Sequence, residues 1–228
     1  MIADNLKRIR ENISQAALKA GRQPHDITLV AVSKLFPIDS IREAFDAGQT
    51  IFGENYIQEV LFKRQQAPST TVFHFIGHLQ SNKAKIAAET CDMIETLDSF
   101  KLGRALNTHL NKLDKDLDAL IQVNIGNDPQ KNGVSEGNTE ELLIQLQELS
   151  RIKVRGLMTI PPLSANPDDS RPHFQKLRNL AEELAAKKLF PSIIKPHLSM
   201  GMSDDFHIAI EEGATIIRIG TAIFGQRK

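Results

Sequence analysis

Short apolar runs alternate with amphipathic stretches along the 228-residue chain. Eight of these runs have the length and composition of strands buried in a parallel sheet. They are Thr28–Leu35, Thr50–Gly53, Val72–Gly77, Asp92–Leu97, Ala119–Ile125, Val154–Ile160, Ile193–Met200 and Thr215–Gly220. The seventh is the weakest, because Pro196 interrupts it. Between the runs, apolar residues recur every three or four positions, which predicts helices.

The start of the chain shows this helical spacing most clearly. Its apolar positions are Ile2, Leu6, Ile9, Ile13 and Ala17, and Gly21 follows as a C-terminal stop. We therefore predict a helix over residues 2–20. Only about eight residues follow the last strand, too few for a final helix, so we expect the N-terminal helix to take that place around the sheet.

Eight strands alternating with helices predict an α/β fold, a single (β/α)8 TIM barrel over residues 1–228 with no second domain. The length is close to the ~250 residues typical of that fold. An open doubly wound sheet is the alternative, but no Gly-x-Gly-x-x-Gly fingerprint follows any strand.

Charge and cysteine content narrow the classes of partner. Lys and Arg total 28, as do Asp and Glu, so the zero formal charge does not favour nucleic-acid or polybasic membrane binding. No stretch approaches the ~20 apolar residues of a membrane span. Cys91 is the only cysteine, which excludes an internal disulfide, and we expect a buried, inert thiol. We predict a cytoplasmic monomer that binds neither nucleic acid nor membrane.

Candidate chemistry begins with Lys34 at the end of the first strand. A buried ammonium costs several kcal/mol unless it is paired, so Lys34 either extends to water or acts as an amine. In a barrel the C-terminal ends of the strands form the working face. Other polar or small residues follow strands two, three, seven and eight: Asn55, His78, Ser199, Gly220 and Thr221.

The loops after strands seven and eight read Leu-Ser-Met-Gly-Met-Ser and Ile-Gly-Thr-Ala. Small residues let the backbone N–H groups approach a phosphate, although two capped tight turns would read the same way. A lysine facing a phosphate cradle indicates a phosphorylated carbonyl compound held as a Schiff base. Pyridoxal 5'-phosphate (PLP) fits this description.

Arg218 lies two residues before Gly220, so both are predicted to face into the barrel. Arginine stays protonated, and opposite a pyridine nitrogen it would donate a hydrogen bond and leave that nitrogen unprotonated. The alternative is an interior arginine paired with a carboxylate such as Glu54 or Asp204.

Six ordered motifs resemble the pyridoxal phosphate homeostasis protein family, the YggS- and PROSC-like proteins related to the barrel domain of alanine racemase. The motifs are Val-Ala-Val-Ser-Lys34, Phe-Gly-Glu-Asn-Tyr56, His-Phe-Ile-Gly77 with Leu-Gln-Ser-Asn-Lys83, Arg-Gly-Leu-Met158, Leu-Ser-Met-Gly-Met-Ser-Asp204 and Arg-Ile-Gly-Thr-Ala-Ile-Phe-Gly225. The resemblance implies a PLP fold-type III barrel with Lys34 as the aldimine lysine and Arg218 at the pyridine nitrogen. It also implies Ser199, Gly220 and Thr221 around the phosphate, and Asn55 near the cofactor.

Two positions depart from the family's motifs, and a third resembles a further element of the family. Phe73 replaces the family's usual tryptophan and His78 its usual proline, so both put the loop after strand three in doubt. His78 is a candidate for contact with the edge of the cofactor. Lys131, in Gln-Lys-Asn-Gly, resembles a Lys-x-Gly element of the family and is either solvated or involved in handing the cofactor on.

The same resemblance bears on catalysis. Related racemases have a second, β-rich domain that contributes a base, and this chain ends where that domain would begin. Tyr56, the only tyrosine, opens a predicted helix and is a poor substitute. We therefore expect a PLP carrier with little or no turnover, whose recipients are apo PLP-dependent enzymes.

Three enzymatic alternatives remain open. They are an amino-acid racemase, a class I aldolase and a metal-dependent hydrolase using His74, His78 and His197. No carboxylate completes a ligand set with the histidines, and no His-x-His pair ends the first strand, so we expect no metal.

Overall fold

The computed structural model describes residues 1–126, 128–162, 164–191 and 195–226. Within them, eight parallel strands close into a barrel, because each pairs with the next barrel strand along the chain and the last pairs with the first. The strands are β1 (Thr28–Val32), β2 (Ile51–Glu54), β3 (Val72–Phe75), β4 (Met93–Leu97), β5 (Leu117–Asn124), β7 (Ile152–Met158), β8 (His197–Ser199) and β9 (Ile216–Ile219). This confirms the predicted TIM barrel over the open sheet.

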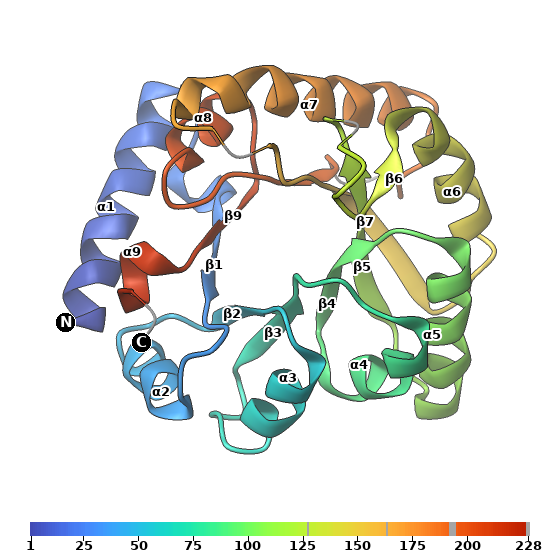
Figure 1. Ribbon diagram of the computed structural model, residues 1–228, viewed down its shortest axis with the longest axis horizontal. Coiled ribbons are helices and arrows are strands. Elements are labelled where there is room, and N and C mark those ends of the chain that lie inside the picture. Colours follow the sequence, from blue (N-terminus) through green and yellow to red (C-terminus); the bar gives the residue numbers. More distant parts are fainter. Residues whose placement is uncertain (127, 163, 192–194, 227–228) are drawn as a thin grey trace.

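Helices surround the barrel (Figure 1). They are α1 (Ile2–Lys19), α2 (Ile38–Asp46), α3 (Ile57–Arg64), α4 (Ala84–Thr90), α5 (Phe100–Leu113), α6 (Thr139–Leu146), α7 (Arg171–Ala186), α8 (Phe206–Glu211) and α9 (Thr221–Phe224). Single 3-10 turns lie at Pro24–Asp26, Ser81–Lys83, Glu136–Asn138 and Pro167–Ser170. In the part of the chain described, no helix has the length and apolarity needed to cross a membrane.

Two features at the ends of the chain bear on the predictions. Helix α1 contacts α2, α8 and α9, so it occupies the position in the outer ring between the first and last helices. The expectation that no helix follows the last strand is wrong, since the one-turn helix α9 forms there.

The seventh barrel strand is shorter than predicted. It begins at His197, directly after Pro196, which has no N–H to give to a strand ladder. Residue 193, where the predicted strand starts, lies outside the described residues.

The interior of the barrel changes from apolar to charged along its axis. A small apolar layer fills one level, made of Val30, Met93, Leu120, Met158 and Ile216. Two residues further along their strands, Glu95 and Arg218 face the same side, because side chains alternate along a strand. Both are buried, at 0% and 3% exposure.

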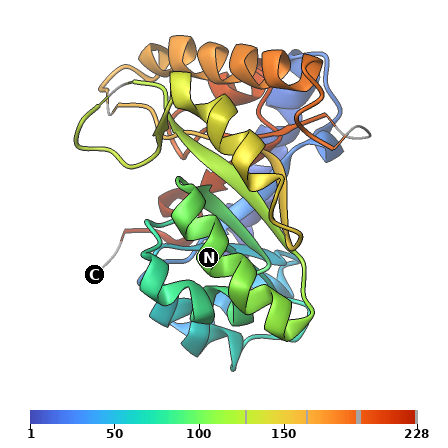
Figure 2. The same ribbon diagram turned by 90° about the vertical axis from the view of Figure 1, so that its right-hand side faces the viewer.

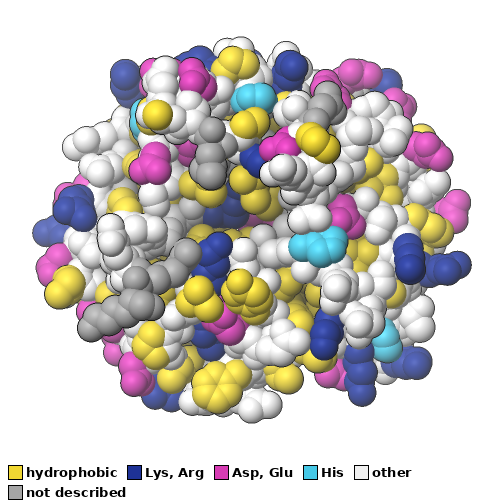
Figure 3. Space-filling model, viewed as in Figure 1, with side chains coloured by type: hydrophobic (Ala, Val, Ile, Leu, Met, Phe, Trp, Pro, Cys, Tyr) yellow, Lys and Arg dark blue, Asp and Glu magenta, His cyan; other side chains and the backbone are white. Residues whose placement is uncertain are grey.

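The loops that follow β5 and β7 project from one end of the barrel (Figure 2). That end faces the viewer in Figure 1, and it is the C-terminal end of the strands. A hollow lies at the centre of this face, with Lys or Arg side chains close to its middle (Figure 3). This mouth is where the functional site of a TIM barrel is expected.

Candidate functional site

Four of the predicted site residues lie together at the mouth. Lys34 follows β1 by two residues, Asn55 directly follows β2, and Gly220 and Thr221 directly follow β9. Strand β1 pairs with both β2 and β9, so these residues occupy neighbouring positions. A Cβ atom on Gly220 would lie 3.2 Å from the carbonyl oxygen of Val32, two residues before Lys34. Lys34 itself is half-buried and interacts with a neighbouring group.

Asn55 has an unmet hydrogen-bonding capacity at this mouth. Its Oδ1 is buried and, within the described residues, has no hydrogen-bond partner. Gly77 lies so close that a Cβ there would come 2.1 Å from the Asn55 carbonyl oxygen, so a larger residue would displace the Asn55 backbone. A buried polar atom without a partner costs about 1–3 kcal/mol. The position therefore fits a ligand that supplies a donor.

Gly220 and Thr221 begin the short helix α9. The Gly220 carbonyl oxygen accepts the N–H groups of Ile223 and Phe224 at 2.9 and 3.0 Å. The first N–H groups of a helix have no partner within it, so those of Thr221 and Ala222 are left for another acceptor. The Thr221 side chain is exposed beside them. This arrangement suits an anionic group.

Arg218 reaches across the interior of the barrel. Its guanidinium donates hydrogen bonds to Ser199 Oγ and, at 2.9 Å, to the Thr159 carbonyl oxygen. It also lies 3.8 Å from Glu95 Oε2, and Ser199 Oγ donates to that same oxygen at 2.5 Å. The side chains of β9, β8 and β4 therefore form one buried cluster.

The carboxylate partner of Arg218 differs from those expected. Glu54 pairs with Lys63 instead, and Asp204 is exposed, so both earlier candidates are wrong. Glu95 is the partner, and sequence reasoning missed it. A carboxylate in the middle of an apolar strand was the available signal, because its burial requires a compensating partner.

His74 completes the cluster, with Nδ1 2.6 Å from Glu95 Oε1. Burial raises the pKa of the Glu95 carboxyl, but the hydrogen bond and charge of His74 and the charge of Arg218 outweigh it. The pKa of Glu95 therefore lies below its ordinary value. Burial lowers the pKa of the Arg218 guanidinium, while Glu95 and Asp205 oppose that shift. Arginine nevertheless remains protonated in proteins.

Ser199 belongs to this cluster and is fully buried. Its hydroxyl donates to Glu95 and accepts from Arg218. In this structure the hydroxyl therefore holds Arg218 in place. Its predicted position beside a phosphate stays a prediction.

The three histidines considered as metal ligands have separate partners. His74 contacts Glu95, His197 Nδ1 lies 3.2 Å from Thr215 Oγ1, and His78 is exposed. Among the residues described, no group of three or more His, Cys, Asp or Glu side chains is arranged to hold a metal ion. The geometry gives the metal-dependent hydrolase no support.

The two departures near strand three lie in different environments. Phe73 is fully buried on β3, where its ring packs against Phe52 and beneath the Arg64 guanidinium. It is part of the core and not of the loop that follows. His78 is in that loop, with Nδ1 3.5 Å from Asp98 Oδ2.

Lys131 is tied to a neighbouring loop instead of being fully solvated. Its Nζ donates to the carbonyl oxygens of Pro161 at 2.5 Å and Ile160 at 3.3 Å, both in the loop after β7. Burial lowers the pKa of Lys131, and Asp128 partly opposes that shift. The loops after β5 and β7 are thereby joined on the same side of the mouth.

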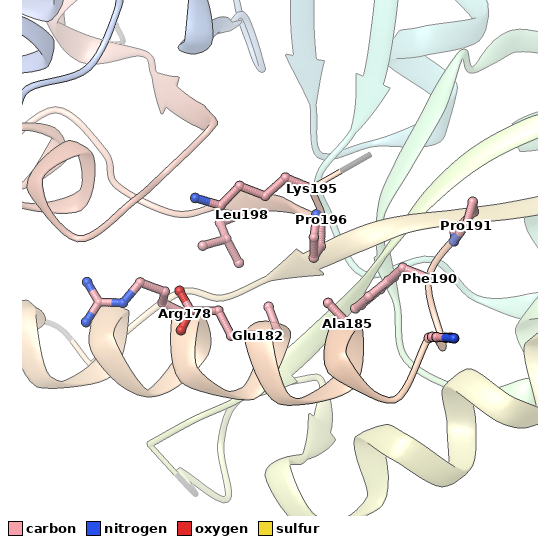
Figure 4. Close-up of a pocket in the computed structure, with 10 residues that line it drawn as sticks. Arg178, Glu182, Ala185, Phe190, Pro191, Lys195, Pro196 and Leu198 are labelled. Atoms are coloured by element: carbon pink, nitrogen blue, oxygen red, sulfur yellow. The ribbon is translucent and has the colours of Figure 1, made fainter. Parts of the chain in front are cut away.

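A separate cavity of about 560 Å³ lies between α7 and the segment leading into β8. Figure 4 shows Arg178 and Glu182 on one side and Lys195 and Leu198 on the other. The cavity lies near the start of β8, at the opposite end of that strand from the mouth. None of the predicted site residues is among those that line it.

The chain is a closed barrel with a lysine after its first strand and an arginine on its last strand. The family model for the N-terminal domain of alanine racemase matches residues 5–228, so the chain belongs to that family.

Within this class the chain belongs to the pyridoxal phosphate homeostasis proteins. It is 43% identical to the one from Aquifex aeolicus (strain VF5) over 226 residues, 99% of this chain and 98% of the relative. It is also 43% identical to the one from Escherichia coli (strain K12) over 231 residues, 99% of this chain and 97% of the relative. PipY of Synechococcus elongatus PCC7942, solved with PLP bound, shares 34% identity and a TM-score of 0.84, covering 99% of this chain and all (100%) of PipY. The resemblance seen in the sequence is confirmed.

Proposed function

We propose that this protein holds pyridoxal 5'-phosphate as a Schiff base on Lys34 and serves PLP homeostasis in the cytoplasm. The Lys34 amine and the cofactor aldehyde form a C=N bond with loss of one water molecule. The observation that carries the proposal is the position of Lys34 beside Asn55, Gly220 and Thr221 at one mouth. The names of the relatives and the PLP bound to PipY support the choice of cofactor.

Each residue has a separate role in this proposal. The N–H groups after Gly220 and the Thr221 hydroxyl bind the phosphate at the rim of the mouth. The Asn55 amide oxygen, which lacks a partner among the described residues, accepts a hydrogen bond at the same rim. The Ser199 hydroxyl holds Arg218, and its place on the phosphate side of the site is taken from the family resemblance.

Arg218 lies deeper, and we place it at the pyridine nitrogen. Ser199 and Thr159 accept two of the five N–H groups that a guanidinium carries, which leaves donors for a ligand. An arginine at that nitrogen keeps it unprotonated, so the bound cofactor is a weak electron sink. The chain therefore favours storage of the cofactor over carbanion chemistry.

Little or no turnover is part of the proposal. Tyr56 stands just before α3 with 53% of its surface exposed, which is a poor position for a catalytic base. We propose that the protein acts as a monomer that delivers PLP to apo PLP-dependent enzymes. Racemisation of amino acids at the rate of a dedicated racemase would overturn the non-catalytic assignment.

The visible spectrum of the purified protein loaded with PLP tests the role of Lys34. We expect a Schiff-base band in the wild type that borohydride bleaches, leaving a reduced adduct on Lys34 in a peptide digest. Lys34→Ala should lack both the band and the adduct, because the amine that forms the C=N bond is removed. Lys101→Ala, on the exposed face of α5, is the matched control and should behave like the wild type. A wild type without a bleachable band would instead favour a class I aldolase.

A further inference from the structure

A buried group of charges lies directly beside Lys34 and has no part in the binding roles assigned above. Lys63 on α3 is 3% exposed and donates to three acceptors. These are the Ser33 carbonyl oxygen at 2.9 Å, Glu54 Oε1 at 2.8 Å and Glu59 Oε2 at 2.6 Å. An ammonium has three N–H donors, so every donor of Lys63 has an acceptor. We call Glu54, Glu59 and Lys63 the α3 charge cluster.

The α3 charge cluster holds the residues on both sides of Lys34. The Ser33 carbonyl oxygen accepts a hydrogen bond from Lys63, and the Ser33 hydroxyl donates one to Glu54 Oε1 at 2.6 Å. The Leu35 N–H donates to Glu59 Oε2 at 2.9 Å. Glu59 Oε2 therefore accepts from Lys63 and from the backbone just after Lys34. Hydrogen bonds to charged groups are among the strongest that a protein forms.

The backbone at Leu35 needs this support. Its φ of +64° is in the left-handed region, which a residue with a Cβ atom adopts only at an energetic cost. Leu35 is also 60% exposed, so burial of its side chain does not offset that cost. The hydrogen bond to Glu59 is the described contact that fixes its N–H.

We infer that the α3 charge cluster, through Glu59, positions Lys34 for attack on the cofactor aldehyde. Ser33 and Leu35 fix the turn on either side, and this sets the direction in which the Lys34 side chain leaves the end of β1. Glu59 is a positioning residue, because it acts on Lys34 through the backbone. The inference rests on the proposed role of Lys34 in PLP binding.

Glu59 is the position to change. Its side chain is 23% exposed, whereas removing Lys63 would leave Glu54 and Glu59 without their cation in a buried site, which is strongly destabilising. Glu59→Ala removes both the charge and the acceptor for Leu35, and Glu59→Gln keeps an acceptor oxygen. The matched control is Glu183→Ala on α7, since Glu183 also pairs with a lysine one turn later, Lys187 at 2.8 Å, far along the chain from Lys34.

Two measurements test the inference. In the protein without cofactor, we expect the Leu35 amide hydrogen of Glu59→Ala to exchange about tenfold faster than in Glu183→Ala. In PLP titrations followed by the Schiff-base band, we expect Glu59→Ala to bind about tenfold more weakly than the control and Glu59→Gln to recover part of the loss.

The outcomes separate this inference from the proposed function. Faster Leu35 exchange with unchanged PLP affinity would overturn the positioning role, as would exchange and affinity that both match the control. A wild type that forms no borohydride-reducible bond at Lys34 would overturn the proposed function, whatever the exchange at Leu35 shows.

Discussion

Glu95 is the carboxylate that compensates the charge of Arg218 inside the barrel. It is fully buried, and its two carboxylate oxygens contact His74 and Ser199, with Arg218 3.8 Å away. Removing one member of a buried ion pair leaves the other charge without compensation, which costs more than the pair itself contributes. The position of the Arg218 guanidinium is therefore expected to depend on a residue that does not reach the mouth.

We predict that Glu95→Gln lowers the free energy of unfolding by about 3 kcal/mol, because Arg218 then keeps its charge in the interior without its paired carboxylate. Urea unfolding at neutral pH measures this change. Glu89→Gln is the control, since Glu89 is exposed on α4 and pairs with Lys85 at 4.0 Å, and it should change the free energy by less than about 0.5 kcal/mol. A Glu95→Gln variant as stable as this control would contradict the assignment.

Burial also determines the chemistry of the Cys91 thiol. It is fully buried, as predicted, and burial raises the pKa of its thiol to about 12. Since the thiolate is the nucleophile, an inert thiol is expected in the folded protein.

At the scale of elements, hydrogen bonds hold the described part of the loop after β5. Asn124 Nδ2 donates to the Asp128 carbonyl oxygen at 2.8 Å, and Asn124 Oδ1 accepts from the Asp128 N–H at 3.1 Å. Residues Val134–Ser135 then pair with the end of β5 as the short strand β6. Lys131 connects this folded loop to the loop after β7.

We predict that Lys131→Ala loads PLP normally but transfers it several-fold more slowly to an apo PLP-dependent enzyme. The expected reason is that Lys131 is an amine of lowered pKa beside the mouth, able to take up a released aldehyde. The time course of activation of the apo-enzyme measures transfer. Lys85→Ala, on the exposed face of α4, serves as the control, and transfer equal to that control would refute the role.

At the scale of the whole molecule, closure of the barrel buries Glu54 completely. Burial raises the pKa of Glu54 to about 7, although the charge and hydrogen bond of Lys63 and the hydroxyl of Ser33 lower it in part. Glu54 Oε2 has no hydrogen-bond partner among the described residues. Ionising this carboxyl therefore opposes folding and lowers the free energy of global unfolding.

This shift gives stability a definite pH dependence. Between pH 4.5 and about 7 the folded protein binds a proton on Glu54 that the unfolded chain has already lost. The contribution of Glu54 to stability is therefore complete below pH 4.5 and is lost as pH rises through about 7. We predict that the free energy of unfolding of the wild type, relative to Glu54→Gln, falls by on the order of 2–3 kcal/mol between pH 5 and pH 8. A difference that stays constant or rises over this range would contradict the prediction.

The sequence by itself determined the closed barrel, because short apolar runs and amphipathic stretches alternate eight times and each obeys a local periodicity. It also placed Lys34, Asn55, Gly220 and Thr221 at one face, since strand ends of a barrel converge whatever the details of packing. Their binding roles came from the family resemblance and remain predictions. Strand ends, such as the late start of β8 at His197, were less well determined, because hydrogen-bond pairing sets them.

Only the tertiary structure decided which charges meet. Glu95 and Arg218 are 123 positions apart. Glu54, one of the two carboxylates considered as an alternative partner for Arg218, pairs instead with Lys63 on the outer helix α3. Pairing of buried charges depends on which strands face each other across the closed barrel and how far each side chain reaches. Residue spacing along the chain gives neither the facing strands nor the reach of a side chain. The hydrogen bonds and ion pairs that hold Arg218 and the turn around Lys34 are therefore seen only in the tertiary structure.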